Sequence, residues 1–398
     1  MINEQESSVL LSIWTRIVSE LALNQDQAPE ETAGQVVNSI CKMPYILDTA
    51  CAAKVFAVEY QRTGSEDFHK RAISALDSIS TLQVTSGLPE PIGESLGWHE
   101  VPGSLAATGM ALDFIFDAER ILGYTKFKDR DFGSFLSFLS KCYNGKGRFA
   151  HNCIVEGRVP SDVQNTTSVA LYLLEHLYQD HHETGNFLFT QRELSIRHLY
   201  YGQTHDGYWP YTYPKYEWVR TIIQHLYPSL GKRWRQHFAY RDILHHVMTL
   251  YFITRYFETS LQKKYIKTVT LGWDWVKNHM IINGDEMVID WSYESVPTSP
   301  CYCNLRDTNT YFWIMALLPH LKKMSVITKS ESDEFIYGIT NHIERGLMSG
   351  VEEKPCIVPH EGPTEILRNI LPMFDQGVAW KGAYLAEIIF DSIVRSEK

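Results

Sequence analysis

The sequence lacks several features that would assign it at once to a common class. The first residues, MINEQESSVLLSIW, carry neither a basic segment nor an apolar run long enough for a signal peptide or a membrane span. Positive charge is also not in excess, and a net charge of -10 gives no reason to expect a nucleic-acid or anionic-membrane partner. We therefore expect a cytoplasmic protein with neither partner.

Cysteine is neither abundant nor regularly spaced. The seven cysteines are an odd number, which favours reduced thiols over a disulfide framework. Cys301 and Cys303 form one C-x-C pair without a second pair nearby, so we expect no structural zinc site. We expect no metal and no cofactor elsewhere in the chain.

What the sequence does contain is a repeat. Pro44, Pro102 and Pro160 are spaced by 58 residues each time, and each precedes a largely apolar stretch rich in Ala, Leu and aromatic residues. Proline followed by small or capping residues is typical of a helix start. Three further segments share the apolar pattern, and they begin at Phe238, Asn304 and Pro372.

Six amphipathic stretches alternate with the apolar ones, and their apolar residues recur at intervals of three and four. They cover roughly 8–24, 65–82, 129–143, 189–204, 261–281 and 328–347. The apolar stretches are predicted as inner helices and the amphipathic ones as outer helices. Residues 1–398 are thus predicted to form a single all-α domain, an (α/α)6 toroid of six inner and six outer helices. An open α-solenoid is the alternative, and six hairpins favour the closed ring.

The expected connections differ in length. Those from an inner to an outer helix are short, whereas those from an outer to the next inner helix are long and rich in aromatic and charged residues. Alternation places all connections of one kind at one end of the ring, so we expect the functional site there. The stretch THDGYWPYTYPKYEWVR, residues 204–220, belongs to the longest connection and is expected to cover the mouth of a central cavity.

A short element in this connection carries a family resemblance. Gln203, Asp206, Gly207 and Trp209 form a Q-x-x-D-G-x-W pattern that resembles the aromatic repeat motif of squalene-type cyclases. Together with the helical repeat, the chain resembles the α/α-toroid superfamily of terpenoid cyclases and protein prenyltransferases, which implies the same fold. In that family the motif ties hairpins together, so both a structural and a site role are open.

The residues for isoprenoid chemistry in this superfamily are missing. The resemblance would place a cyclase acid in the run Asp162-Val-Gln164-Asn, where an amide that cannot protonate an alkene stands instead. The run from Asp113 to Asp117 lacks the second acid of a diphosphate-binding motif, and no zinc triplet has matching positions. We predict that Asp162 and Gln164 bind a polar substrate, with helix capping and loop packing as the alternative.

Acid–base residues are instead predicted at the starts of the fourth and fifth inner helices. In the run from Arg241 to His246, spacings of three and four put Asp242 on one helix face with His245 and His246. An Asp–His pair suits general acid–base chemistry near neutral pH. Asp307 occupies the corresponding place in the fifth helix. Asp242, His245, His246 and Asp307 are the predicted catalytic residues, with a helix cap and packed core histidines as alternatives.

Aromatic and polar residues near the same end are predicted to bind the substrate, because aromatic faces stack on sugar rings and polar groups hydrogen-bond hydroxyls. The predicted substrate-binding residues are Trp98, His99, Asp162, Gln164, Tyr208, Trp209, Tyr211, Arg241, Trp291 and Tyr293. The favoured function is a toroid enzyme that hydrolyses, cleaves by elimination or epimerises a saccharide or glycoconjugate, so the expected partner is a small molecule or an oligosaccharide. A non-standard terpenoid cyclase, hydratase or dehydratase and a non-catalytic glycan- or protein-binding toroid are the alternatives.

Overall fold

Helices dominate the computed structural model of the chain. It describes residues 4–37, 44–80, 104–125, 132–154, 164–181, 187–210, 243–260, 264–290, 309–348 and 377–396. The strands in these ranges form two small antiparallel sheets, which pair β1 (Val36–Val37) with β2 (Pro44–Tyr45) and β3 (Met280–Asn283) with β4 (Glu286–Ile289). The all-α prediction is therefore confirmed.

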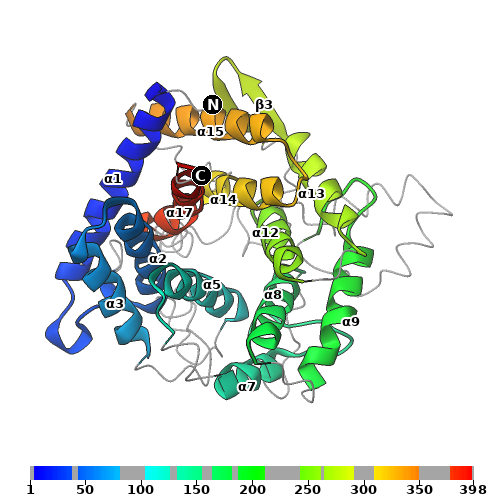
Figure 1. Cartoon of the computed structure of the whole chain (residues 1–398). Helices are drawn as coiled ribbons and strands as arrows, with labels where there is room; N and C mark the ends of the chain where they lie inside the picture. Colours follow the sequence, from blue (N-terminus) through cyan, green and yellow to red (C-terminus); the bar gives the residue numbers. More distant parts are fainter. Residues whose placement is uncertain are drawn as a thin grey trace, which may run out of the picture.

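Six helices form a closed inner ring (Figure 1). In chain order they are α2 (Ile46–Thr63), α5 (Leu105–Leu122), α8 (Gln164–His181), α12 (Ile243–Thr259), α14 (Asn309–Lys323) and α17 (Gly377–Ser396). Each packs against the next, and α17 packs back against α2. This closure confirms the toroid and excludes the open α-solenoid. All six helices lie in the segments predicted as inner.

The other six helices of the described ranges surround the ring (Figure 1). They are α1 (Glu4–Asp26), α3 (Glu66–Ser80), α7 (Phe132–Cys142), α9 (Phe187–Gly202), α13 (Lys267–Lys277) and α15 (Lys329–Met348). The helices α3, α9, α13 and α15 each pack against the inner helix that precedes them in the chain. The first helix, α1, packs against α17 and so joins the two ends of the sequence in one hairpin.

Burial separates the two sets of helices as the sequence pattern predicts. An inner helix touches two ring neighbours, an outer helix and the ring interior, so every residue of α5 from Leu105 to Glu119 is buried. An outer helix buries a single stripe, which in α3 runs from Ala72 to Ile79. None of the described helices is long and apolar enough to cross a membrane.

The inner helices start at one common end of the ring because each outer helix returns the chain to it. We call this end the rim. Ser104 caps α5 there, with its Oγ accepting a hydrogen bond from Ala107 N (3.3 Å). Two described connections reach the rim: Leu105 N of α5 donates to His151 O (2.7 Å), and residues 203–210 contact the start of α12.

Candidate functional site

The two histidines at the start of α12 face different neighbours. His246 precedes Arg255 by about two and a half helical turns, so it lies on the face of α12 opposite the one that Arg255 presents to the ring interior. His245 precedes Phe252 by about two turns and lies on the same side of α12. On that side Phe252 packs against Tyr172 of α8, with ring centroids 5.7 Å apart. His245 is half-buried, whereas His246 is fully buried.

His246 is held inside the wall of the ring. Its Nδ1 accepts a hydrogen bond from Trp209 N (3.2 Å), and its Nε2 donates to Gly272 O (3.1 Å). The rings of Tyr208, Trp209 and Trp275 surround the imidazole at centroid distances of 5.4, 5.3 and 4.5 Å. Because the fold engages both ring nitrogens, the packed-core alternative accounts for His246, and its predicted catalytic role gains no support.

The Q-x-x-D-G-x-W element joins three helices. Gln203 Nε2 donates to Gly207 O (2.8 Å) and to a backbone oxygen of α13 (2.9 Å). Trp209 Nε1 donates to Leu199 O of α9 (2.8 Å). Tyr208 and Trp209 are 2% and 1% exposed, so these two predicted substrate-binding residues pack between α9, α12 and α13. The contacts fit the structural reading of the motif.

We expect Gly207→Ala to destabilise the protein by roughly 2–3 kcal/mol, because a side chain there is strained in two ways. Gly207 has φ +94°, and an added Cβ would lie 2.1 Å from Leu271 O. Gly284 is the matched control, since it has φ +68° with no atom within 4 Å of the added Cβ. Gly284→Ala should cost only about 1 kcal/mol, from the left-handed backbone alone. Urea denaturation compares the two, and equal losses would contradict the close packing of the motif.

Gln164, the first residue of α8, is buried without being satisfied. It is 1% exposed, and neither its Nε2 nor its Oε1 has a hydrogen-bond partner among the described residues. An unpaired buried amide costs about 1–3 kcal/mol. The next residue, Asn165, donates to the Sδ of Met248 in α12 (3.3 Å). Met248 lies about one helical turn after His245. The first turns of α8 and α12 therefore adjoin at the rim, where a free amide can bind the hydroxyl groups of a polar molecule.

The ring interior holds a buried cluster of charges that sequence reasoning missed. All six inner helices contribute to it. We call it the ionic core, and its members are Lys54, Asp113, Asp117, Tyr172, Tyr251, Arg255, Glu258, His320 and Glu387. The sequence feature that could have predicted this cluster is a charged residue in the middle of an otherwise apolar inner helix.

Arg255 is the most connected cation of the ionic core. Its Nη2 lies 2.9 Å from Asp113 Oδ1 and 3.1 Å from Asp117 Oδ1, and it also donates to Tyr172 Oη (3.2 Å). Lys54 pairs with Glu387 and lies 2.9 Å from Asp117 Oδ2, as an ion pair rather than an aligned hydrogen bond. Burying charges is costly unless each is paired, and here each carboxylate meets at least one cation.

Three groups of the ionic core, Glu387, His320 and Asp117, keep their charge at neutral pH. Burial opposes ionisation of Glu387, but Lys54 and His320 overcome it and lower the pKa of Glu387 to about 2. Burial alone would lower the pKa of His320, yet Glu258 and Glu387 raise it to about 9. Burial likewise opposes ionisation of Asp117, whose pKa Arg255 and Lys54 hold well below its usual value. Groups whose pKa values lie this far from neutrality are poor proton shuttles.

These pKa shifts predict a pH-dependent stability. Protonated His320, with a pKa raised from 6.5 to about 9, stabilises the fold fully below pH 6.5 and loses that contribution as the pH rises through 9. The loss is on the order of 3 kcal/mol. Glu387, lowered from 4.5 to about 2, stabilises the fold above pH 4.5 and ceases to do so as the pH falls. Urea midpoints should therefore peak between these limits, and a His320→Gln variant should lack most of the alkaline decline. A wild-type midpoint that stays flat from neutral pH to pH 9 would contradict this assignment.

The remaining predicted site residues lie outside the described residues. They are Trp98, His99, Asp162, Tyr211, Arg241, Asp242, Trp291, Tyr293 and Asp307. Their roles stay predictions. Of the predicted set, the structure brings Gln164 and His245 to the adjoining first turns of α8 and α12 and places Tyr208, Trp209 and His246 in the wall behind them.

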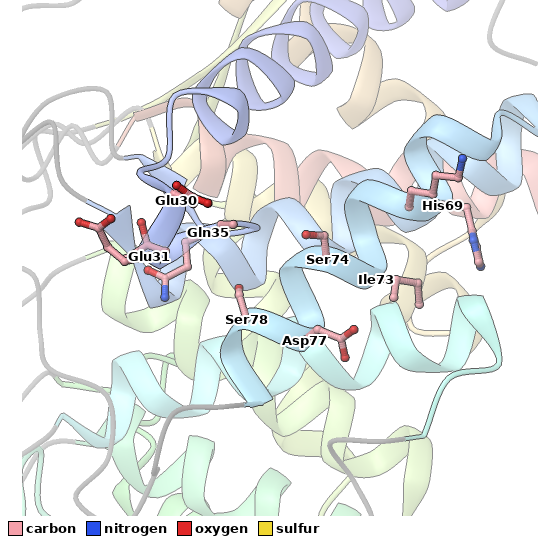
Figure 2. A pocket seen from close by; sticks show the side chains of 11 residues that line it. Glu30, Glu31, Gln35, His69, Ile73, Ser74, Asp77 and Ser78 are labelled. Atoms are coloured by element: carbon pink, nitrogen blue, oxygen red, sulfur yellow. The ribbon is translucent and has the colours of Figure 1, made fainter.

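A pocket of about 690 Å³ lies elsewhere, between α3 and the short helix η1 (Glu30–Thr32). Figure 2 shows Glu30, Glu31 and Gln35 on one wall and Ser74, Asp77 and Ser78 of α3 on the other. It belongs to the outer layer of the ring and includes none of the predicted site residues. In the described ranges, no group of three or more His, Cys, Asp or Glu side chains could hold a metal ion.

Comparison with known proteins identifies the architecture. No family model matches the sequence, and no curated protein is significantly similar to it. A structure of an unsaturated glucuronyl hydrolase specific for heparin aligns with a TM-score of 0.62 at 12% identity, over 98% of this chain and 98% of that chain. Cellobiose 2-epimerase from Bacillus thermoamylovorans B4167 aligns with a TM-score of 0.57 at 10% identity, over 93% and 100%. The chain has the (α/α)6-toroid fold.

A toroid with different chemistry is also similar. A type II terpene cyclase from Scytonema aligns with a TM-score of 0.50 at 11% identity, over 96% of this chain and 98% of that chain. Because these proteins differ in activity and share little sequence with the chain, the likeness establishes the fold alone.

Proposed function

We propose that the chain is an enzyme that acts on a saccharide or glycoconjugate at the rim of the ring by general acid–base chemistry. The reaction is hydrolysis, elimination or epimerisation, each of which requires a proton to be moved to or from an oxygen or carbon of the sugar. His245 and Asp242 are the proposed acid–base pair, with Asp307 as a second acid. Gln164 is proposed to bind substrate hydroxyls.

The observation that carries this proposal is the buried amide of Gln164, which has no hydrogen-bond partner among the described residues. Buried polar groups are nearly always hydrogen-bonded in folded proteins, so an unpaired one calls for an explanation. A sugar hydroxyl can both accept from Nε2 and donate to Oε1. The half-buried imidazole of His245 lies on the α8-facing side of α12 at the same end of the ring, and histidine exchanges protons near neutral pH. A polar substrate bound there would have a binding group and an acid–base group together.

The ionic core supports a site at the rim rather than one passing through the ring. Lys54, Asp117 and Glu387 are each less than 9% exposed, so side chains fill the ring interior at their level. A substrate that enters from the rim meets this filled layer as a floor. The long connections that the sequence predicts at this end, together with a filled centre, favour a cleft, as binding a saccharide chain requires.

The similar structures supply a further reason for a sugar substrate. Two of the proteins with this fold are, by their descriptions, a hydrolase specific for heparin and an epimerase of cellobiose. We extend only the substrate class, a saccharide, to this chain.

A terpenoid substrate is the second candidate, and one observation favours it. Tyr251, Trp313 and Tyr384 form a buried aromatic group with ring centroids 5.2 and 4.1 Å apart, and aromatic faces stabilise carbocations. The group lies directly beside the ionic core, where Tyr251 Oη donates to Asp113 Oδ2 (2.9 Å). A hydrocarbon gains little binding free energy beside so many charged groups. The terpenoid substrate therefore ranks below the saccharide.

A substrate panel tests the proposal. The purified protein is incubated with unsaturated uronide oligosaccharides, β-1,4-linked disaccharides, mannan oligosaccharides, and linear isoprenoids with and without a diphosphate, and products are read by mass spectrometry and NMR. We expect conversion of a saccharide and no change in the isoprenoids. A cyclised isoprenoid product would overturn the ranking, and saccharide binding without conversion would support the non-catalytic toroid.

A further inference from the structure

Two cysteines meet at the end of α7. Cys142 is the last residue of that helix, and its Sγ lies 3.8 Å from the Sγ of Cys153 in the connection that follows. Two backbone hydrogen bonds hold the segments side by side, from Ala150 N to Cys142 O (2.8 Å) and from Ile154 N to Lys141 O (2.8 Å). The approach of the two sulfurs is therefore built into the backbone of the connection.

The two thiols differ in reactivity. Cys142 is buried and Cys153 half-buried, so only the second is open to a solvent-borne oxidant. The thiol of Cys142 donates to Cys153, and this contact lowers the pKa of Cys153 despite the opposing effect of its burial, with help from Lys141. The same contact and burial raise the pKa of Cys142. Cys153 has the thiolate character and access of an oxidisable cysteine, and Cys142 is placed to resolve it.

We propose that Cys142 and Cys153 form a reversible dithiol–disulfide site that hydrogen peroxide oxidises. The Cys153 thiolate attacks one peroxide oxygen, the O–O bond breaks, and a proton converts the departing oxygen to water, which leaves a sulfenic acid. The Cys142 sulfur then attacks the Cys153 sulfur and loses its proton, and a second water departs as the S–S bond forms. In total, two thiols and one peroxide give one disulfide and two waters.

The geometry needs little change for this step. The sulfurs must close from 3.8 Å to about 2 Å, a change of less than the length of two covalent bonds. Cys51 is also a described free cysteine, but it is fully buried in α2 and serves as an internal control.

Oxidation at this site would act on the rim. The connection between the two cysteines holds the starts of two inner helices: His151 O accepts from Leu105 N of α5 (2.7 Å), and Phe149 O accepts from Thr166 Oγ1 of α8 (3.0 Å). A disulfide would tie the end of α7 to this same connection. We expect the oxidised protein to melt several degrees higher and to resist cleavage after Lys146 and Arg148 in the folded state.

Peptide mapping of the full-length protein tests the proposal. The reduced protein is treated with hydrogen peroxide, alkylated in denaturant, digested with trypsin and analysed without reduction. Trypsin separates the two cysteines, because Lys146 and Arg148 lie between them. We expect one cross-linked pair that joins the peptide containing Cys142 to the peptide containing Cys153, and its disappearance after treatment with dithiothreitol. Cys51 should remain alkylated.

Two variants separate the roles of the cysteines. Cys142→Ser should leave Cys153 as a sulfenic acid that dimedone traps, and Cys153→Ser should leave Cys142 reduced. The wild-type map decides the matter even if a variant folds poorly. Separate alkyl groups on both cysteines after peroxide, or a sulfinic acid at Cys153 without a cross-link, would overturn the proposal.

Discussion

Arg255→Met is expected to destabilise the protein by about 3–5 kcal/mol, the typical cost of leaving buried charges without a partner. Arg255 contacts carboxylates on α5 and α17, and its removal strips Asp113 of the only cation within 4 Å of it in the described part of the chain. Met keeps most of the length and apolar volume of the Arg side chain, so the loss of stability measures the effect of removing the positive charge. Urea denaturation followed by tryptophan fluorescence measures it as a lower midpoint.

Arg120→Met is the matched control, since it removes the same kind of side chain from Asp117, an acid that Arg255 also contacts. Arg120 Nη2 lies 3.0 Å from Asp117 Oδ1, but its side chain is 58% exposed. Solvent screens this ion pair, so the substitution should cost less than about 1 kcal/mol. If both variants lose the same stability, or if Arg255→Met loses none, then the ionic core does not hold the ring together.

His245→Ala and Asp242→Asn are each expected to lower turnover of the saccharide substrate by roughly 10²–10⁴-fold, the usual contribution of a positioned general acid or base. The melting temperature should stay near that of the wild type, because His245 is half-buried at the first turn of α12. Turnover at saturating substrate, measured on protein with an unchanged melting temperature, gives the comparison. Unimpaired turnover in both variants would remove this pair from the mechanism.

His246→Ala provides the contrast on the adjacent residue. His246 is 0% exposed, and both of its nitrogens are hydrogen-bonded to the backbone. We therefore expect this variant to lose stability, by several kcal/mol from the cavity and the two unpaired backbone groups. The opposite outcome, a stable but inactive His246→Ala protein, would restore the catalytic prediction for His246.

The fold was predictable because its signal is local. Each inner helix is apolar on all sides and each outer helix on one stripe, and a difference in periodicity of this kind can be read within a single helix. Counting six hairpins then indicated a closed ring, which the contact of α17 with α2 confirms. The start of α5 follows the predicted order of proline, capping residue and apolar helix: Ser104, two residues after Pro102, is the N-cap, and the helix begins at Leu105.

The candidate site and the ionic core were less predictable because their residues meet only after the ring closes. Lys54 and Glu387 are 333 residues apart in the sequence and form an ion pair in the interior. No local pattern pairs them. The two histidines of α12 show the same limit: they are adjacent in sequence, but His245 lies on the side of the helix that faces α8, whereas His246 lies inside the wall. To distinguish them one must know which face of α12 carries Arg255 into the ring interior, and only the folded ring defines that face.

The central claim is that the rim beside Gln164 binds a saccharide, and Gln164→Leu tests it most directly. Gln164 has no hydrogen-bond partner among the described residues, so replacing its amide with an apolar group of similar size should leave stability unchanged or raise it by about 1–2 kcal/mol. The measurement is saccharide binding by isothermal titration calorimetry, with the urea midpoint recorded on the same preparation. We expect Gln164→Leu to weaken saccharide binding by at least about tenfold in a protein at least as stable as the wild type. Undiminished binding by that stable variant, or a variant that unfolds, would contradict it.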